Sequence, residues 1–360
     1  MCTDEMNPPI LQKLQPYLVA LALSLCGGAI FQLINIPLPW MLGPLFFVGL
    51  SSVRGVNVKE IKGSRQTGQL IIGCNLGLYF TAEVGRELLN YGLYIVIVSF
   101  CAIFLGMLGG FVLKRIAGTS PATSFFASLP GGATEMAALA ERAGARPDQV
   151  ALSHSIRILI VVTIIPFAVN MSGAGGIDAY TPLTLVTSPK GLVIMALLAI
   201  LSGFIFRKAK ISNAWFLGPL AIVAVLTLHD ISLSAIPSFL SLFAQILLGC
   251  ALGSQFEPSL AHESKDLLIG VFCSGLITLC LSALMGLTVA LLINESVPTL
   301  ILATSPGGLL EMCITAEILK LGVPLVTSFQ VMRLAVVVSC AMPAWKLLQA
   351  ITDKYCTPKQ

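Results

Sequence analysis

Long apolar runs follow one another along nearly the whole chain, separated by short breaks that are polar or contain proline or glycine. Many of these runs approach a length of about 20 residues, which an α-helix needs to cross a bilayer. They lack the ten-residue segments of alternating apolar and polar residues that are typical of a membrane β-barrel. The pattern therefore predicts an all-α polytopic membrane protein. The ten predicted spans cover residues 17–35, 40–53, 67–80, 91–113, 150–170, 191–206, 215–228, 239–256, 267–293 and 323–348.

Two further apolar segments, at about 119–143 and 297–318, are interrupted by the same kind of break. The first contains Ser128-Leu129-Pro130-Gly131-Gly132-Ala133-Thr134-Glu135-Met136, and the second contains Thr304-Ser305-Pro306-Gly307-Gly308-Leu309-Leu310-Glu311-Met312. Proline followed by two glycines breaks a helix, and a carboxylate in an apolar setting costs free energy. The combination indicates a functional site that the chain contains twice.

The second half of the chain repeats the first in a nearly constant register. Trp40-Met41-Leu42-Gly43-Pro44-Leu45 matches Trp215-Phe216-Leu217-Gly218-Pro219-Leu220 at an offset of 175 residues. Gln69, Gly73, Gly77, both Pro-Gly-Gly-x-x-Glu-Met stretches and Arg157 have their matches at an offset of 176. We expect repeat 1 at 17–170, a linker at 171–190 and repeat 2 at 191–348, with cytoplasmic end segments at 1–16 and 349–360.

The distribution of basic residues predicts how the interrupted segments enter the membrane. If each segment turns back, every repeat has five crossings and the two repeats have opposite orientations. Of the 21 Lys and Arg residues, sixteen then lie on one side, three on the other, and two inside spans. If the segments cross instead, the split among the same loop residues is eleven to eight. The positive-inside rule therefore favours re-entrant Pro-Gly-Gly hairpins, inverted repeats and cytoplasmic termini.

Composition supports the membrane class and excludes others. Hydrophobic residues make up 56% of the chain and charged residues 11%, whereas soluble domains carry about 25% charged residues. The net charge of +4 is small, so we expect no nucleic acid partner. His154, His229 and His262 are the only histidines and are far apart, and the ten cysteines form no C-x-x-C pair. We therefore expect no metal, no cofactor and no enzymatic activity.

The two hairpin tips carry the predicted substrate site. Each tip frees backbone amides and begins a half-helix whose N-terminal dipole attracts anions, an arrangement found in transporters with inverted repeats. We expect the substrate to contact Gly131, Gly132, Gly307 and Gly308, together with Thr134. The alternative is that each Pro-Gly-Gly marks a surface loop, which leaves the duplication and the charge distribution unexplained.

Glu135 and Glu311 lie in the first turn after each tip and have two candidate roles. The carboxylate can cap the free amides of the half-helix, as in a capping box, or it can bind the coupling proton or Na⁺. Glu141 and Glu317 lie six residues further on, where a solvated position is expected.

Arg157 and Arg333 lie inside predicted spans, and a buried guanidinium needs an anion. The partner is either Glu135 or Glu311, or else an anionic substrate. His154 precedes Arg157 by three residues and shares its helical face, so it is a candidate for proton transfer or for an interhelical hydrogen bond. Secondary polar candidates are Gln69, Gln245 and Asn75.

The doubled W-x-L-G-P, the doubled P-G-G-x-x-E-M and the spacing to the intramembrane arginines resemble the bacterial AbrB-type membrane proteins, often labelled as ammonia monooxygenases. The resemblance covers essentially the whole chain. It implies a family but transfers no catalytic or substrate residue. The hairpins also look like those of sodium-coupled citrate and glutamate carriers, which is an analogy of fold and not a functional assignment.

Together these features predict a secondary transporter of a small anionic or amphipathic metabolite, coupled to H⁺ or Na⁺, in the bacterial cytoplasmic membrane. The alternative is a membrane-embedded sensor that influences gene expression indirectly without transport. The expected partners are the lipid bilayer, the substrate and the coupling ion. A homodimer stays open, because Gly27, Gly28 and Gly203 are small residues of the kind that mediate helix contacts in membranes.

Overall fold

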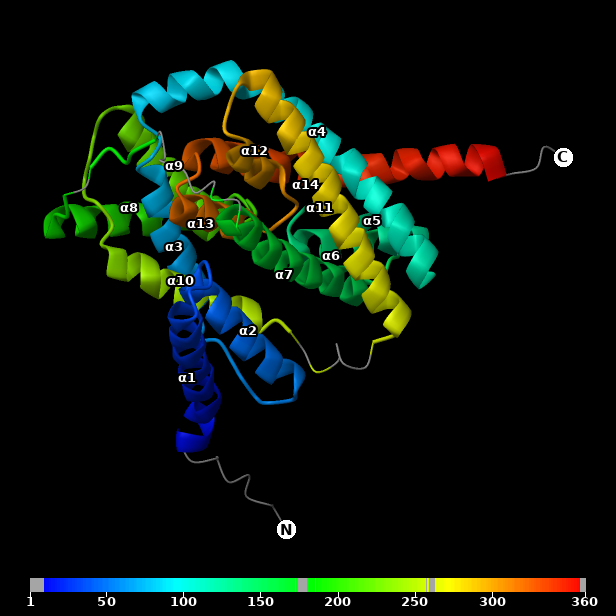
Figure 1. Cartoon of the computed structure of the whole chain (residues 1–360), viewed down its shortest axis with the longest axis horizontal. Coiled ribbons are helices and arrows are strands. Elements are labelled where there is room, and N and C mark those ends of the chain that lie inside the picture. Colours follow the sequence, from blue (N-terminus) through cyan, green and yellow to red (C-terminus); the bar gives the residue numbers. More distant parts are fainter. Residues whose placement is uncertain are drawn as a thin grey trace, which may run out of the picture. The chain divides into compact units, whose positions relative to one another are not determined.

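The computed structural model describes residues 10–171, 173, 180–184, 186–256, 258 and 263–356. These residues form fourteen helices and no strand (Figure 1). In the first half the helices are α1 (Ile10–Leu33), α2 (Pro39–Val53), α3 (Ser64–Gly77), α4 (Ala82–Ala117), α5 (Pro121–Ser128), α6 (Ala133–Arg142) and α7 (Pro147–Met171). In the second half they are α8 (Pro189–Lys208), α9 (Ala214–Leu228), α10 (Ser238–Gly253), α11 (Lys265–Ile293), α12 (Val297–Thr304), α13 (Leu309–Leu319) and α14 (Val323–Cys356).

Each of the ten predicted spans corresponds to a helix, so the prediction of an all-helical fold is confirmed. Six helices, α1, α4, α7, α8, α11 and α14, are long and apolar enough to cross a bilayer. The helices α2, α9 and α10 are apolar but have only 15 or 16 residues. Parts of the predicted end segments and linker, namely 1–9, 172, 174–179, 185 and 357–360, lie outside the described residues.

The helices belong to two compact units. One unit holds α1, α2 and α10 with most of α3, and the other holds α4 to α9 and α11 to α14 with the end of α3. In the second unit α4 packs along α11 and α14, and the short helices α5 and α12 pack against α4 and α11 respectively. The core around the first interrupted segment includes Phe125, Phe126, Leu129, Met136 and Trp345.

Proline ends the first short helix of each interrupted segment. Leu129 and Ser305 precede the prolines and are extended, with ψ of 137° and 138°. This is the conformation that a following proline imposes, because the α-region would clash with its ring. The next helix starts after the second glycine, with Gly132 and Gly308 as N-caps. We call residues 129–132 the first tip and residues 305–308 the second tip.

The sequence repeat reappears as repeated helix contacts. Trp40 of α2 lies against Gly28 of α1, and Trp215 of α9 lies against Gly203 of α8, so that any added Cβ would touch the indole ring. Phe204 adds an edge-on contact to Trp215, with ring centroids 5.0 Å apart. The small residues that left a homodimer open in the sequence are therefore engaged in packing within the chain.

A second repeated contact joins helices of different halves. Gly73 of α3 lies against the backbone of α9, where an added Cβ would be 2.6 Å from the Phe216 carbonyl oxygen. At the matching position Gly249 of α10 lies against α2, and its added Cβ would collide with the carbonyl oxygen of Met41. Helix α3 of the first half thus pairs with α9, and helix α10 of the second half pairs with α2. The two halves exchange equivalent contacts.

Candidate functional site

Two buried arginines hold the tips. Arg157 on α7 is 4% exposed and Arg333 on α14 is 5% exposed. Arg333 donates hydrogen bonds to the carbonyl oxygens of Ser305 and Gly307, the latter at 2.9 Å. Both acceptors belong to the second tip, immediately beyond the C-terminus of α12. Carbonyl groups at a helix C-terminus lack intrahelical donors and carry the negative end of the dipole, so they suit a guanidinium.

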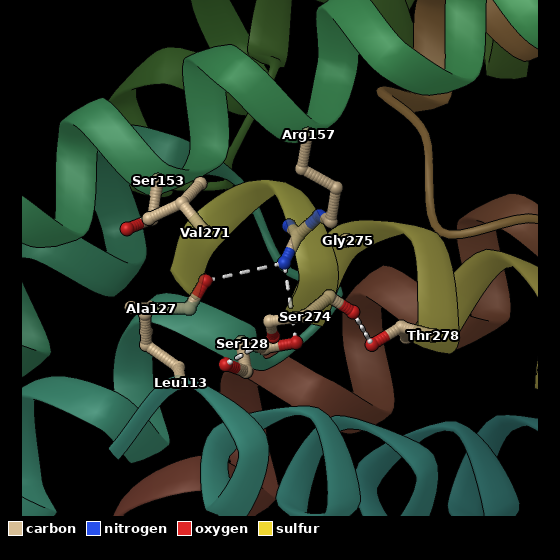
Figure 2. Close-up of a pocket in the computed structure, with 9 residues that line it drawn as sticks. All are labelled: Leu113, Ala127, Ser128, Ser153, Arg157, Val271, Ser274, Gly275 and Thr278. Atoms are coloured by element: carbon tan, nitrogen blue, oxygen red, sulfur yellow. Dashed lines mark hydrogen bonds between the residues drawn. The ribbon is translucent and has the colours of Figure 1, made fainter. Parts of the chain in front are cut away.

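Arg157 connects the end of α5, next to the first tip, with the second tip. Its Nη1 donates to the carbonyl oxygens of Ala127 at 3.3 Å and Ser128 at 3.1 Å, at the end of α5 (Figure 2). Its Nε donates to the carbonyl oxygen of Pro306 at 3.1 Å, in the second tip. The structure therefore brings together the two Pro-Gly-Gly stretches that lie 176 residues apart in the sequence, through one side chain.

Neither arginine forms an ion pair with a carboxylate of the described residues, where the ion pair within 4.0 Å joins Arg146 and Asp148 on the surface. Backbone carbonyls at the end of α5 and in the second tip accept hydrogen bonds from the buried guanidinium groups. Two positive charges thus lie among backbone dipoles, with no described carboxylate in salt-bridge range.

The glutamate and methionine of each motif fold back over the two glycines. An added Cβ on Gly308 would collide with the Glu311 carboxylate, and one on Gly307 would be 2.8 Å from Met312 Cε. The matching contacts occur at the first tip, where Glu135 lies over Gly132 and Met136 over Gly131. The spacing P-G-G-x-x-E-M therefore places the glutamate and the methionine in contact with the two glycines of the same motif. Each carboxylate lies at the N-terminal end of its half-helix, where a capping residue would lie. Glu311 is buried, Glu135 is half-buried and Thr134 is exposed.

His154 is fully buried beside Arg157. Its Nδ1 lies 2.8 Å from Arg157 Nη2, and its Nε2 lies 3.0 Å from the Phe126 carbonyl oxygen. Because a guanidinium can only donate, Nδ1 accepts and Nε2 carries the proton. In the second half Gln330 takes this position and donates to the Leu302 carbonyl oxygen at 3.1 Å. His154 and Gln330 therefore donate equivalent hydrogen bonds, to carbonyl groups that match at the 176-residue offset of the repeat.

A small pocket next to Arg157 is lined by hydroxyl groups (Figure 2). It has room for about one water molecule. Ser128 and Ser274 lie 3.2 Å apart through their Oγ atoms, and Thr278 donates to the Ser274 carbonyl oxygen at 2.7 Å. Ser153 also lines the pocket. Sequence reasoning missed the α11 hydroxyls, although the four-residue spacing of Ser274 and Thr278 places them on one face of an apolar helix.

The comparisons with known proteins agree with the sequence motifs. A family model described as "Transition state regulatory protein AbrB" matches residues 40–349. The chain belongs to the AbrB family. It is 28% identical over 357 residues to "Uncharacterized protein YhjN" of Bacillus subtilis (strain 168), covering 91% of this chain and 92% of the relative. It is 24% identical over 318 residues to "Putative regulator AbrB" of Escherichia coli (strain K12), covering 87% and 90%. The family resemblance is thereby confirmed.

In this AbrB-family chain the remaining polar candidates have separate surroundings. Gln69 and Gln245 are buried in the unit that contains α1 and α2, whereas the tips and both buried arginines belong to the other unit. Asn75 on α3 donates to Glu317 Oε1 on α13 at 2.5 Å. We expected Glu141 and Glu317 to be solvated. Glu141 is exposed, whereas Glu317 is half-buried, with Oε1 bonded to Asn75 and Oε2 buried.

Proposed function

We propose that this protein is a secondary transporter of a small, negatively charged metabolite, which binds between the two tips. The observation that carries the proposal is the pair of buried guanidinium groups, Arg157 and Arg333, neither of which has a carboxylate of the described residues within 4.0 Å. Burying an unpaired charge costs several kcal/mol, and carbonyl dipoles offset only part of that cost. An anionic substrate would supply the missing charge.

The proposed topology is a pair of inverted repeats, each with five crossings and one re-entrant hairpin, with both termini on the cytoplasmic side of the inner membrane. The short helices support it. At 1.5 Å per residue the eight residues of α5 or α12 rise about 12 Å, less than half of the hydrocarbon thickness of about 30 Å. The reciprocal contacts of α3 with α9 and of α10 with α2 also suit two halves related by a twofold axis. The shorter helices of each repeat would cross where the bilayer is locally thinner.

Coupling to H⁺ or Na⁺ belongs to the same proposal. Glu135 and Glu311 lie over the glycines at the positive ends of α6 and α13, where they can exchange a cation as the site opens to either side. The glycine amides, Thr134 and the arginines would contact the substrate. We further propose that the protein acts without nucleic acid and has no enzymatic activity, and a homodimer stays a proposal.

Flux measurements in proteoliposomes test the proposal. Purified protein is reconstituted, and a series of small carboxylates and phosphate esters is offered under imposed proton and sodium gradients. We expect saturable, gradient-driven uptake of at least one anion. Arg157→Gln and Arg333→Gln should lower it at least about tenfold, because each removes charge-assisted bonds worth about 1.5–3 kcal/mol. Arg142→Gln removes an exposed charge on α6 and is the matched control. Folded protein that moves none of these anions contradicts the proposal.

The name of the Escherichia coli relative supports the second candidate, a sensor that binds the same ligand without moving it. A ligand that binds the folded protein raises its apparent stability, so a thermal-shift screen with the same anions finds the ligand in either case. Binding without gradient-driven flux would favour the sensor, and binding with flux would favour the transporter.

A further inference from the structure

The carboxylate of Glu317 is a second charged group of interest, apart from the tips. The residue is half-buried on α13 and reaches α3, where Asn75 Nδ2 donates to Oε1 at 2.5 Å. Its other oxygen, Oε2, is buried and has no hydrogen-bond partner. A carboxylate that accepts one bond and leaves a buried oxygen unsatisfied is costly in the ionised form. Its counterpart Glu141 is exposed, so the duplication does not require this arrangement.

No cation within the described residues compensates Glu317. Its own helix also carries Glu311 and Cys313. Of the helices packed against it, α7 carries Asp148, His154 and Arg157, and the described side chains of α14 include Arg333, Cys340 and Lys346. Helix α3, which supplies Asn75, carries Arg65 and Cys74. None of the basic side chains lies within the 4.0 Å of an ion pair with Glu317. The carboxylate must therefore be neutralised by something that binds to it.

The surroundings of Oε2 fit a proton better than a metal cation. A sodium ion binds through several oxygen ligands, as other hard cations do. Oε2 has no hydrogen-bond partner, and the described residues contain no group of three or more His, Cys, Asp or Glu side chains that could hold a metal ion. A proton needs no further ligand and converts the carboxylate to a neutral carboxyl.

We propose that Glu317 is a proton-binding site of this protein, with the proton on Oε2 and Asn75 oriented to Oε1. This inference rests on the proposed transport function only for its role in coupling, since it names a further carboxyl, besides Glu135 and Glu311, that can carry a coupling proton. Release of the proton leaves an anion that binds the Asn75 amide more strongly. The bond connects α3 with the half-helix after the second tip, so proton occupancy would change how firmly that half-helix is held.

Infrared difference spectroscopy tests the proposal on detergent-solubilised full-length protein, with the proton as the probe. We expect a carbonyl band of a protonated carboxyl that disappears as the pH is raised. Glu317→Gln should remove this band, and Glu141→Gln, the matched change at the exposed position, should leave it. Asn75→Leu should move the midpoint of the band to higher pH, because it removes the donor that favours the ionised form. A Glu317 that stays ionised over the whole pH range would show neither the band nor its shift.

Chemical labelling of the native chain covers the case in which Glu317→Gln does not fold. An apolar carbodiimide reacts with protonated carboxyls in apolar surroundings, and peptide mass spectrometry locates the adduct. We expect an adduct at Glu317 that falls as the pH rises. A band that survives Glu317→Gln in folded protein, or no adduct at Glu317 at any pH, overturns the site. Neither readout requires flux: a titrating Glu317 with no anion transport contradicts the proposed function alone, whereas transport with a silent Glu317 contradicts this inference alone.

Discussion

Side chains of opposite charge lie at opposite ends of the short helices that flank each tip. Arginines bind carbonyl groups where α5 and α12 end, and glutamates lie over the glycines where α6 and α13 begin. Each matches the sign of the dipole at its end. The pairing explains how the tips remain folded while the arginines keep a net positive charge. Arg157 has the larger role, because it alone bonds both to the end of α5 and to the second tip.

The exchange of His154 for Gln330 between the halves predicts that the imidazole acts as a hydrogen-bond donor. We expect His154→Gln to keep the bond to the Phe126 carbonyl and to lower the free energy of unfolding by less than about 1 kcal/mol. His154→Leu leaves that carbonyl and one Arg157 donor unpaired, at a cost of about 1–3 kcal/mol. Denaturant unfolding in detergent measures both. Loss of proton-driven flux in a stable His154→Gln protein would instead assign His154 to proton transfer.

Glycine determines how the helices approach one another. Gly43 of α2 lies against the backbone of Gly27 in α1, and Gly218 of α9 lies against the backbone of Ser202 in α8. In a membrane, where lipid is as apolar as a leucine, such close approach is a main source of helix association. The W-x-L-G-P motif is therefore a packing motif in both halves, with its tryptophan and its glycine contacting the preceding helix.

Gly43→Ala should destabilise the protein. The added methyl group meets main-chain atoms of Gly27, which cannot move as the end of a flexible side chain can. The expected cost is about 1–3 kcal/mol, as for other overpacked sites. Gly92→Ala on α4 is the control, because nothing lies within 4 Å of its added Cβ, and it should be neutral or slightly stabilising. Thermal unfolding of the two variants in the same detergent measures the difference. Equal melting temperatures would contradict the close α1–α2 contact at Gly43.

The helices and part of the candidate site could be predicted from the sequence. Apolar length and proline breaks are local signals, so the helices and both tips were predictable. The burial of Glu317 was not, because its partner Asn75 lies 242 residues away and lacks a matched polar residue in the second half. The α11 hydroxyls were hidden for the same reason, since an apolar span reads alike whether its serine faces a pocket or a neighbouring backbone.

The molecule as a whole is built from two halves that use the same contacts. The first half supplies an arginine to the second tip through Arg157 and Pro306, and the helices α3 and α10 each pair with a helix of the other half. In the topology that we propose, two repeats related by a two-fold axis make these equivalent contacts with equivalent residues. The orientation of the repeats in the membrane would then decide whether the proposed site can open to both sides in turn.

Inverted repeats predict that equivalent hairpin ends face opposite sides of the membrane. Arg142 on α6 and Ile318 on α13 are equivalent and exposed. In a background without native cysteines, we expect Arg142→Cys to react with a membrane-impermeant thiol reagent only from the cytoplasmic side. Ile318→Cys should react only from the opposite side. Inside-out and right-side-out vesicles expose the two sides of the membrane to the reagent, and opening the vesicles with detergent shows that each cysteine is reactive.

Labelling of both cysteines from the same side would mean parallel repeats. Two parallel hairpins would enter from one face, so the site could not open alternately to both faces by exchange of equivalent halves, and the sensor would become the better proposal.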